Sequence, residues 1–203
     1  MKRILILTAI AALFFSTESY AQEEEDGYSL AAVKLDWTLV EDLAGTVKGY
    51  PVSNMKDGNK ATAWAGDLSV TIDGTKEFDD SAVYGDGFYG FKLSVKASSL
   101  EYLIITPGYA KSAETFRNNI RPSVITIYDG TAWKNDGGEF IDGEDYAEPL
   151  AIALLQDSPE PQIIPIKPRS GDTDVIWFCI SDVVPGAKYF DNCISELEFY
   201  GQK

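Results

Sequence analysis

Residues 182–200 read DVVPGAKYFDNCISELEFY and combine a tight turn with the last strand of the chain. Pro185 presets φ and Gly186 can adopt φ > 0, so the two residues predict a turn. The residues from 193 to 200 then alternate in the way that a strand requires. One predicted face holds Cys193, Ser195, Leu197 and Phe199, and the other holds Ile194, Glu196, Glu198 and Tyr200. Two carboxylates on one face indicate either a solvated edge strand or part of a binding site.

Strand patterns continue through the rest of the chain, and the sequence shows no helical period over a usual helix length. They lie at 33–40, 68–72, 88–95, 100–106, 124–128, 150–155, 162–166 and 175–180. Loops are predicted for 74–87 and 133–148, and 107–122 is a long connection. Because no crossover helices separate the strands, the sequence predicts an all-β fold, an antiparallel β-sandwich of the jelly-roll type.

The first 21 residues have the pattern of a secretory signal peptide. Lys2 and Arg3 precede an apolar run from Ile4 to Phe15, and small residues occupy positions 19 and 21. The apolar run is too short to cross a membrane, so we expect no membrane insertion. These features predict a signal peptide at 1–21, a single domain at 22–203, and a periplasmic or secreted protein.

Composition narrows the classes of function. The chain has a net charge of −15 and contains 0 His residues among 203. The negative charge argues against nucleic acid as a partner and suits a neutral ligand or a cation, although it also serves solubility alone. Lack of His removes Ser-His-Asp catalysis and His-ligated zinc. We therefore expect no enzyme, with a two-carboxylate glycoside hydrolase as the formal alternative.

The chain has 2 cysteines, Cys179 and Cys193. In an exported protein they are candidates for one disulfide, and two buried thiols are the alternative. The strand pattern gives no distance between them, so both readings stay open.

Residues 54–64 read NMKDGNKATAW and contain the tight turn Asp57-Gly58-Asn59. Turned backbone carbonyls beside one carboxylate and one hydroxyl match the hard oxygen ligands that Ca²⁺ prefers. One loop rarely completes such a shell, so a second carboxylate is needed, and Glu196 is the candidate. The alternative is an ordinary turn without a cation.

The connection at 107–122 mixes an aromatic ring, amides and cations. Sugar binding needs this mixture, because a sugar offers a flat apolar face and many hydroxyls. The candidate ligand-binding residues are Tyr109, Lys111, Asn118 and Arg121, with Trp64 and Tyr189 as neighbours. The alternative is a structural loop whose polar groups bind backbone carbonyls.

Together these motifs resemble the discoidin-like (coagulation factor 5/8 type C) domain of the galactose-binding-like fold, and more closely its NADase-type glycan-binding branch. The resemblance covers about 52–201. Its motifs are the Asp-Gly-Asn-x-x-Thr-x-Trp loop at 57–64, Gly-x-x-Gly at 87–90, the connection at 108–121, the turn at 182–191 and Ile-Ser-Glu-x-x-Phe at 194–199. The segment 154–164 also fits. The segments 73–86 and 133–148 match nothing in this pattern.

The resemblance implies an eight-stranded jelly-roll core with both termini near one end, and glycan binding without catalysis. It also implies a structural calcium ion. The implied ligands are the carbonyls of Asn54, Asn59, Thr62 and Ser195, the hydroxyl of Thr62, and the carboxylates of Asp57 and Glu196. We expect a monomer whose partner is a glycan or another extracellular ligand, and the alternative is an adhesion module that binds protein.

Overall fold

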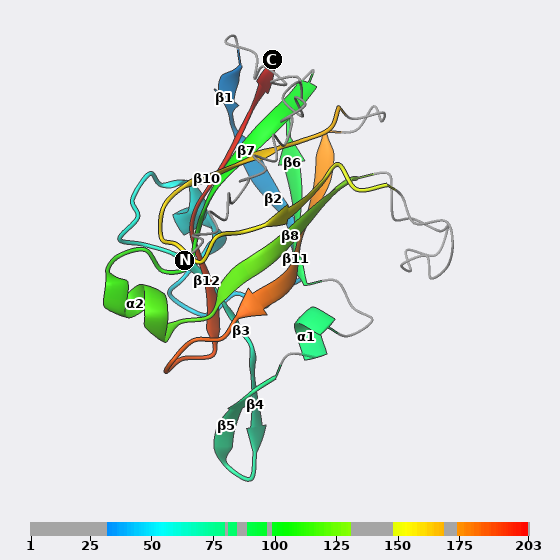
Figure 1. Ribbon diagram of the computed structural model, residues 1–203. Helices are drawn as coiled ribbons and strands as arrows, with labels where there is room; N and C mark the ends of the chain where they lie inside the picture. Colours follow the sequence, from blue (N-terminus) through cyan, green and yellow to red (C-terminus); the bar gives the residue numbers. More distant parts are fainter. Residues whose placement is uncertain are drawn as a thin grey trace, which may run out of the picture.

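The computed structural model describes residues 32–79, 81–84, 89–96, 99–130, 148–168 and 174–202. In this part of the chain two antiparallel sheets face each other and confirm the predicted all-β jelly-roll sandwich (Figure 1). The first sheet contains β1 (Val33–Leu35), β3 (Trp64–Asp67), β7 (Ser99–Pro107), β10 (Gln162–Pro165) and β12 (Asp191–Gln202). The second contains β2 (Trp37–Asp42), β6 (Gly90–Val95), β8 (Arg121–Asp129), β9 (Ala151–Leu154) and β11 (Val175–Val184).

The two sheets bury their facing side chains in one core. Phe91 and Phe178 of the second sheet and Phe199 of the first are each 0 % exposed. Trp64 meets Phe91 edge to face, with ring centroids 4.8 Å apart, so β3 contributes the largest core side chain. Such aromatic pairs contribute about 0.5–1.5 kcal/mol beyond their buried area.

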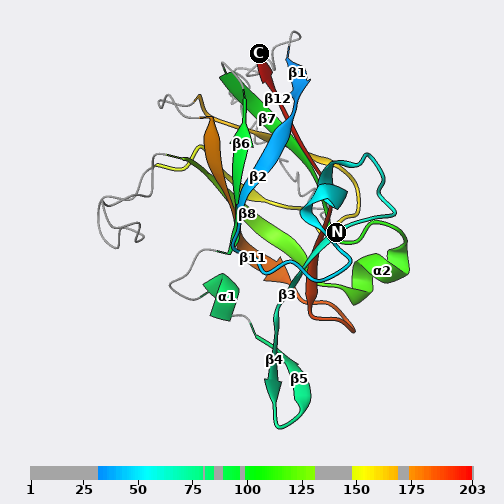
Figure 2. The ribbon, with the colours of Figure 1, turned by 180° about the vertical axis from the view of Figure 1, so that it is seen from behind.

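The last strand organises the first sheet. β12 pairs with β1, β3 and β7, and the register places Val33 opposite Gly201. The first and last described strands of the domain therefore lie side by side, at the end of the sandwich marked C in Figures 1 and 2.

The predicted faces of β12 are wrong at its beginning. Ile194 shares the main core with Leu197 and Phe199, whereas Cys193 packs with Ala63 and Ala65 in a second, smaller cluster. The change of cluster coincides with a change of pairing partner, because β12 pairs with β3 over residues 191–194 and with β7 from residue 196 onward. Ser195 and Glu196 lie at this change of partner.

The strand predicted at 68–72 is confirmed as β4 (Ser69–Ile72), and segments predicted as loops or connections contain further structure. Residues 69–78 form a hairpin of β4 and β5 (Thr75–Phe78) that projects from one end of the sandwich (Figure 2). Asp73 and Gly74 join the strands with φ of 49° and 80°, as a type I′ turn requires. The helices among the described residues are η1 (Val52–Lys56), α1 (Ser81–Tyr84) and α2 (Ala113–Asn118).

Helix α2 begins at a capping box, because the Ser112 side chain accepts from Thr115 N and the Thr115 hydroxyl accepts from Ser112 N.

The predicted signal peptide at 1–21 and most of the loop at 133–148 lie outside the described residues. No helix in the described ranges is long and apolar enough to cross a membrane.

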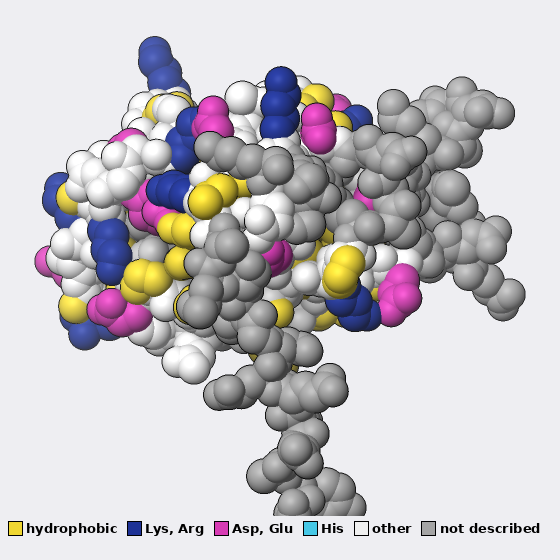
Figure 3. Space-filling view, turned by 90° about the horizontal axis from the view of Figure 1, so that it is seen from above, with side chains coloured by type: hydrophobic (Ala, Val, Ile, Leu, Met, Phe, Trp, Pro, Cys, Tyr) yellow, Lys and Arg dark blue, Asp and Glu magenta, His cyan; other side chains and the backbone are white. Residues whose placement is uncertain are grey.

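Charges of both signs mix on the surface. Viewed from the end where β1 lies, Lys and Arg side chains stand beside Asp and Glu side chains rather than in separate fields (Figure 3).

Candidate functional site

The loop of residues 54–62, called the cation loop from here on, gathers oxygen atoms around Asp57. One Asp57 oxygen accepts the Asn59 backbone N–H at 2.8 Å. The Thr62 hydroxyl lies 2.7 Å from the other Asp57 oxygen and 2.7 Å from the Asn59 carbonyl. Gly58 closes the turn with φ of 74°, a conformation that other residues adopt only with strain.

Strand β12 carries Glu196 to this loop. Glu196 is 7 % exposed, and neither of its buried carboxylate oxygens has a hydrogen-bond partner. Burial and then the charge of Asp57 raise its pKa, while the nearby backbone N–H groups of Gly58 and Asn59 act in the opposite direction. A buried carboxylate that has only these two N–H groups nearby, and no hydrogen bond of normal geometry, is costly, and the charge of Asp57 increases that cost.

These oxygens fit a hard cation. A Ca²⁺ ion takes six to eight oxygens from carboxylates, hydroxyls and carbonyls in a flexible shell. Among the described residues, neither this site nor any other brings together three or more His, Cys, Asp or Glu side chains that could hold a metal ion. The pair Asp57 and Glu196 would therefore need backbone carbonyls to complete the shell.

The side chains of the two remaining predicted ligands hold the backbone in place. The Asn54 amide donates to the Ala63 carbonyl at 2.8 Å. The Ser195 hydroxyl donates to the Gly108 carbonyl at 3.0 Å and accepts the Ala110 N–H at 2.9 Å. For both residues the prediction concerns the carbonyl, which the side-chain bonds help to orient.

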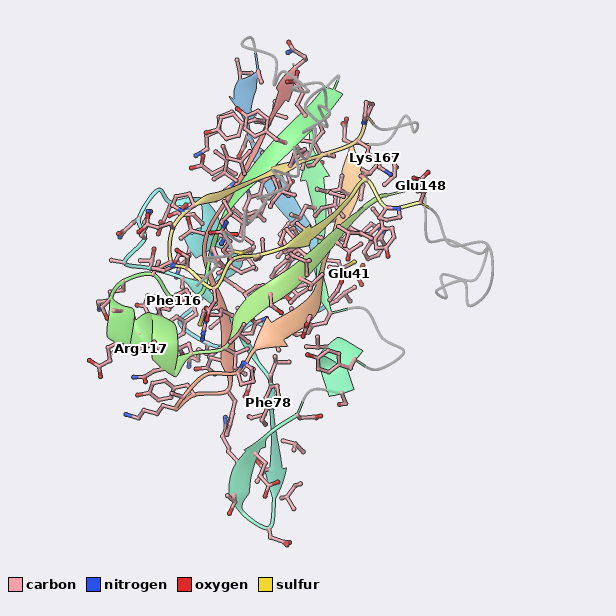
Figure 4. All side chains as sticks on the ribbon, in the orientation of Figure 1. Glu41, Phe78, Phe116, Arg117, Glu148 and Lys167 are labelled. Atoms are coloured by element: carbon pink, nitrogen blue, oxygen red, sulfur yellow. The ribbon has the colours of Figure 1, made fainter. Side chains whose placement is uncertain are left out.

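Four of the six predicted ligand-binding residues surround α2, and we call them the α2 face. They are Tyr109, Lys111, Asn118 and Tyr189. Lys111 is exposed, Tyr189 is 44 % exposed, and Tyr109 and Asn118 are half-buried. Figure 4 shows α2 standing out from the sandwich, with Arg117 pointing away from it.

The other two predicted contacts, Trp64 and Arg121, are wrong. Trp64 is 0 % exposed, and its indole N–H donates to the Thr46 hydroxyl at 2.9 Å. Arg121 is 7 % exposed and packs over the Phe116 ring at 4.7 Å. Both side chains are buried and bonded within the fold rather than presented at the surface.

Arg121 instead joins α2 to a distant loop. Its guanidinium donates two hydrogen bonds to the Asp157 carboxylate, one of them at 2.8 Å from Nη2 to Oδ2. The pKa of Asp157 is lowered chiefly by this hydrogen bonding, against the effect of burial. The bidentate geometry is the one that Arg forms best and Lys cannot reproduce.

The turn at 185–189 docks on the end of α2. The backbone N–H groups of Lys188 and Tyr189 both donate to the Asn118 carbonyl, at 3.1 and 2.8 Å. A Cβ at Gly186 would lie 2.6 Å from that carbonyl oxygen, so the close approach requires glycine. This contact brings Tyr189 to the α2 face from a segment about 70 residues away in the sequence.

Sequence reasoning missed Tyr50, which stands beside Tyr109. The two rings meet edge to face with centroids 6.2 Å apart, and Tyr50 is 37 % exposed. The Tyr109 hydroxyl donates to the Ala61 carbonyl of the cation loop at 3.1 Å. No local motif marks Tyr50, because its neighbour is 59 positions away.

Sequence reasoning also missed a cleft of about 470 Å³ between β2 and η1. Its walls are mostly apolar, with Lys56 and Asp42 as the charged residues in the lining. Lys56 donates to the Trp37 carbonyl at 2.6 Å and pairs with Asp36. Asp42 accepts from the Ala44 and Thr46 backbone N–H groups.

The two cysteines are free thiols, so the disulfide reading is wrong. Cys179 belongs to β11 of the second sheet, and Cys193 belongs to β12 of the first. Their core-facing neighbours Phe178 and Ile194 point into the space between the sheets, which leaves both thiols turned away from that space. Burial raises the pKa of both thiols.

Comparison with known proteins yields one family and several solved structures. The model of the NAD glycohydrolase translocation F5/8 type C domain family matches residues 33–200. No curated protein sequence matches the chain.

Three solved structures illustrate the structural likeness. One is the family 32 carbohydrate-binding module of Clostridium perfringens NanJ in complex with galactose, at 16 % identity and a TM-score of 0.46, covering 84 % of this chain and 99 % of that one. The second is a GH31 CBM32-2 bound to GalNAc, at 14 % identity and a TM-score of 0.48, covering 83 % and 99 %. The third is truncated AlyQ with CBM32 and alginate lyase domains, at 11 % identity and a TM-score of 0.45, covering 84 % and 33 %. The chain thus spans a third of the length of that last protein.

Proposed function

The chain belongs to the family of NAD glycohydrolase translocation F5/8 type C domains, and from this premise we propose that it is a non-catalytic glycan-binding domain whose site is the α2 face. Support comes from the chemistry of that face. Tyrosine rings, an amide and an ammonium group stand together at the surface, where a sugar could place its apolar face and its hydroxyls.

One observation carries this proposal: two separate segments bring partly exposed tyrosines to α2. The Tyr109 carbonyl accepts from the Thr115 hydroxyl of α2, and the Tyr109 ring contacts Tyr50 edge to face. The Tyr189 backbone N–H donates to the Asn118 carbonyl at the end of the helix. Lys188 lies 5.0 Å from the centre of the Tyr189 ring. Rigid, partly exposed rings lose little conformational entropy when a ligand binds, which favours them as contact residues.

Calcium is the second part of the proposal. The residues that would hold it are those of the cation loop together with Ser195 and Glu196. The ion would supply positive charge to the two carboxylates that now lack one. It would thereby join the cation loop to the last strand.

Export is the third part. The pattern at 1–21 supports a leader, and millimolar calcium is an extracellular condition that suits a weak oxygen site. We propose a periplasmic or secreted protein that acts as a monomer.

A hydrolase finds less support in the described residues. Carboxylates lie near one another at Glu196, beside Asp57 and Glu198, and at Asp191, beside Asp67, and burial first and then these charges raise the pKa of Glu196 and of Asp191. Neither set lies in the cleft of about 470 Å³, where the one carboxylate, Asp42, already accepts backbone hydrogen bonds. A two-carboxylate mechanism needs both groups at one accessible bond.

A protein-binding module is the second candidate, because one strand exposes large apolar side chains. Leu154 and Ile152 on β9 are 84 % and 67 % exposed. β9 is also the last strand of its sheet. Exposed apolar groups on an edge strand are typical of protein contacts.

A glycan array separates the two candidates. We expect the purified protein to bind a defined subset of glycans, and the double variant Tyr109→Ala, Tyr189→Ala to lose that binding while it still melts cooperatively. The matched control is Ile152→Ser, Leu154→Ser, which should keep glycan binding. Glycan binding that survives loss of both tyrosines would move the site away from the α2 face.

A further inference from the structure

We infer that Tyr109 and Ser195 are positioning residues that link the cation loop to the α2 face, so that calcium binding and glycan binding strengthen each other. This inference rests on the proposed function. It adds a regulation of the glycan site that follows from contacts between the two regions.

The first link is the Tyr109 hydroxyl. It donates to the carbonyl of Ala61, which lies between the predicted ligands Asn59 and Thr62. The Ala61 N–H in turn donates to the Asn59 side-chain oxygen at 3.0 Å. The direction of the Ala61 carbonyl therefore depends on the same turn that presents the cation ligands.

The second link is the Ser195 hydroxyl, which is 0 % exposed. Its two hydrogen bonds reach Gly108 and Ala110, the residues on either side of Tyr109. The next residue along β12 is Glu196. The backbone that carries the Tyr109 ring is therefore bound to the strand segment that carries the unpaired carboxylate.

The backbone around Tyr109 has little freedom to shift independently. Gly108 has φ of 72°, and a Cβ there would lie 2.7 Å from the Phe116 ring. The Gly108 N–H donates to the Cys193 carbonyl at 2.9 Å. A displacement of β12 near Ser195 is thus transmitted to Tyr109 rather than absorbed.

Binding of a cation at Asp57 and Glu196 would stabilise the arrangement in which both links to Tyr109 are made. Helix η1, which begins the cation loop, packs against β12, and Tyr109 is held from both sides: by the Ala61 carbonyl of the loop and, through Gly108 and Ala110, by the Ser195 hydroxyl of the strand. A cation that binds both carboxylates favours the arrangement in which Tyr109 keeps all its bonds. Coupling of this kind is reciprocal, because each ligand must change the affinity of the other by the same factor.

The test measures calcium affinity by calorimetry in Tyr109→Phe and Ser195→Ala. Both substitutions leave the carboxylates and backbone carbonyls of the predicted shell in place. Loss of one hydrogen bond predicts about a fivefold weaker calcium affinity for Tyr109→Phe. The matched controls are Tyr200→Phe, which removes a hydroxyl bonded to Glu198, and Ser181→Ala, which removes a hydroxyl bonded to Thr126. Both controls should keep the wild-type calcium affinity.

The second measurement is the affinity for the best glycan of the array, with calcium and with chelator. We expect calcium to raise glycan affinity several-fold in the wild type and in both controls. Ser195→Ala should reduce that factor toward one, and it carries the test if Tyr109→Phe does not fold. Unchanged calcium affinity in both variants would overturn the inference even if glycan binds. Weakened calcium affinity without any glycan binding would refute the proposed function and leave the two links intact.

Discussion

Replacing Glu196 by Gln tests the cation site more directly than any other change. The substitution keeps the shape of a side chain that is 7 % exposed and removes a charge that has no partner. In chelator we expect Glu196→Gln to be more stable than the wild type by about 1 kcal/mol, the low end of the cost of an unsatisfied buried group. With calcium the order should reverse.

The size of the reversal follows from linkage. Extracellular calcium modules have dissociation constants of about 0.1–1 mM. At about 1 mM calcium and the tighter value, binding stabilises the wild type by about 1.4 kcal/mol. For a domain of this size that corresponds to a rise of about 3–6 °C in Tm. Glu196→Gln should show no rise, and Asp57→Ala should lose the response as well.

The assay is thermal melting in chelator and across a calcium titration. Glu198→Gln is the matched control, because Glu198 lies two residues further along β12 and pairs with Lys34 at the surface at 2.7 Å. That control should respond to calcium like the wild type. The reasoning fails if the wild-type Tm does not move with millimolar calcium, or if Glu196→Gln is equally destabilised in chelator and in calcium.

Three further outcomes follow from the described contacts. Arg121→Lys should lower the free energy of unfolding in urea by about 1.5–3 kcal/mol, because Lys cannot replace the bidentate bond to Asp157, yet glycan binding by the folded fraction should persist. Because Arg121 lowers the pKa of Asp157, the pair stabilises the fold fully above the ordinary carboxyl pKa of 3.8, and this stabilisation is lost as the pH falls through the lower pKa of the folded state. Asp157→Asn should therefore make the free energy of unfolding less dependent on pH in this acidic range. An unchanged pH dependence would contradict the pairing. Cys179 and Cys193 should react with a thiol reagent only after unfolding, and reduction should leave the intact mass unchanged; a mass gain of two hydrogens would restore the disulfide.

The sheets were predictable because each strand buries one face. Apolar runs at 100–106 and 175–180 are what strands in a two-layer core require, and the structure confirms strands there. The predicted faces fail at β12 near Ile194, where the strand passes from pairing with β3 to pairing with β7. This change of partner depends on distant segments, and no residue type encodes it locally.

The candidate site divides in the same way. Proximity of Asp57 and Glu196 could be proposed from motif order, because both sit at fixed places in one recognisable pattern. The exposure of the candidate sugar-binding residues could not be predicted, because Trp64 and Arg121 have residue types that are common in sugar sites but are buried in the interior here. Their burial depends on partners far along the chain, Phe91 and Asp157, which only the folded chain brings near.

Strand β12 explains why the cation loop and the α2 face lie next to each other in this fold. At residues 194–196 the strand passes from pairing with β3 to pairing with β7, and there the Ser195 hydroxyl bonds to the backbone on both sides of Tyr109. The following residue, Glu196, is buried where the charge of Asp57 acts on it. Because one short segment supplies both contacts, a change that loosens residues 194–196 should weaken the cation loop and the position of Tyr109 together, whereas changes at the far end of β12 should affect neither.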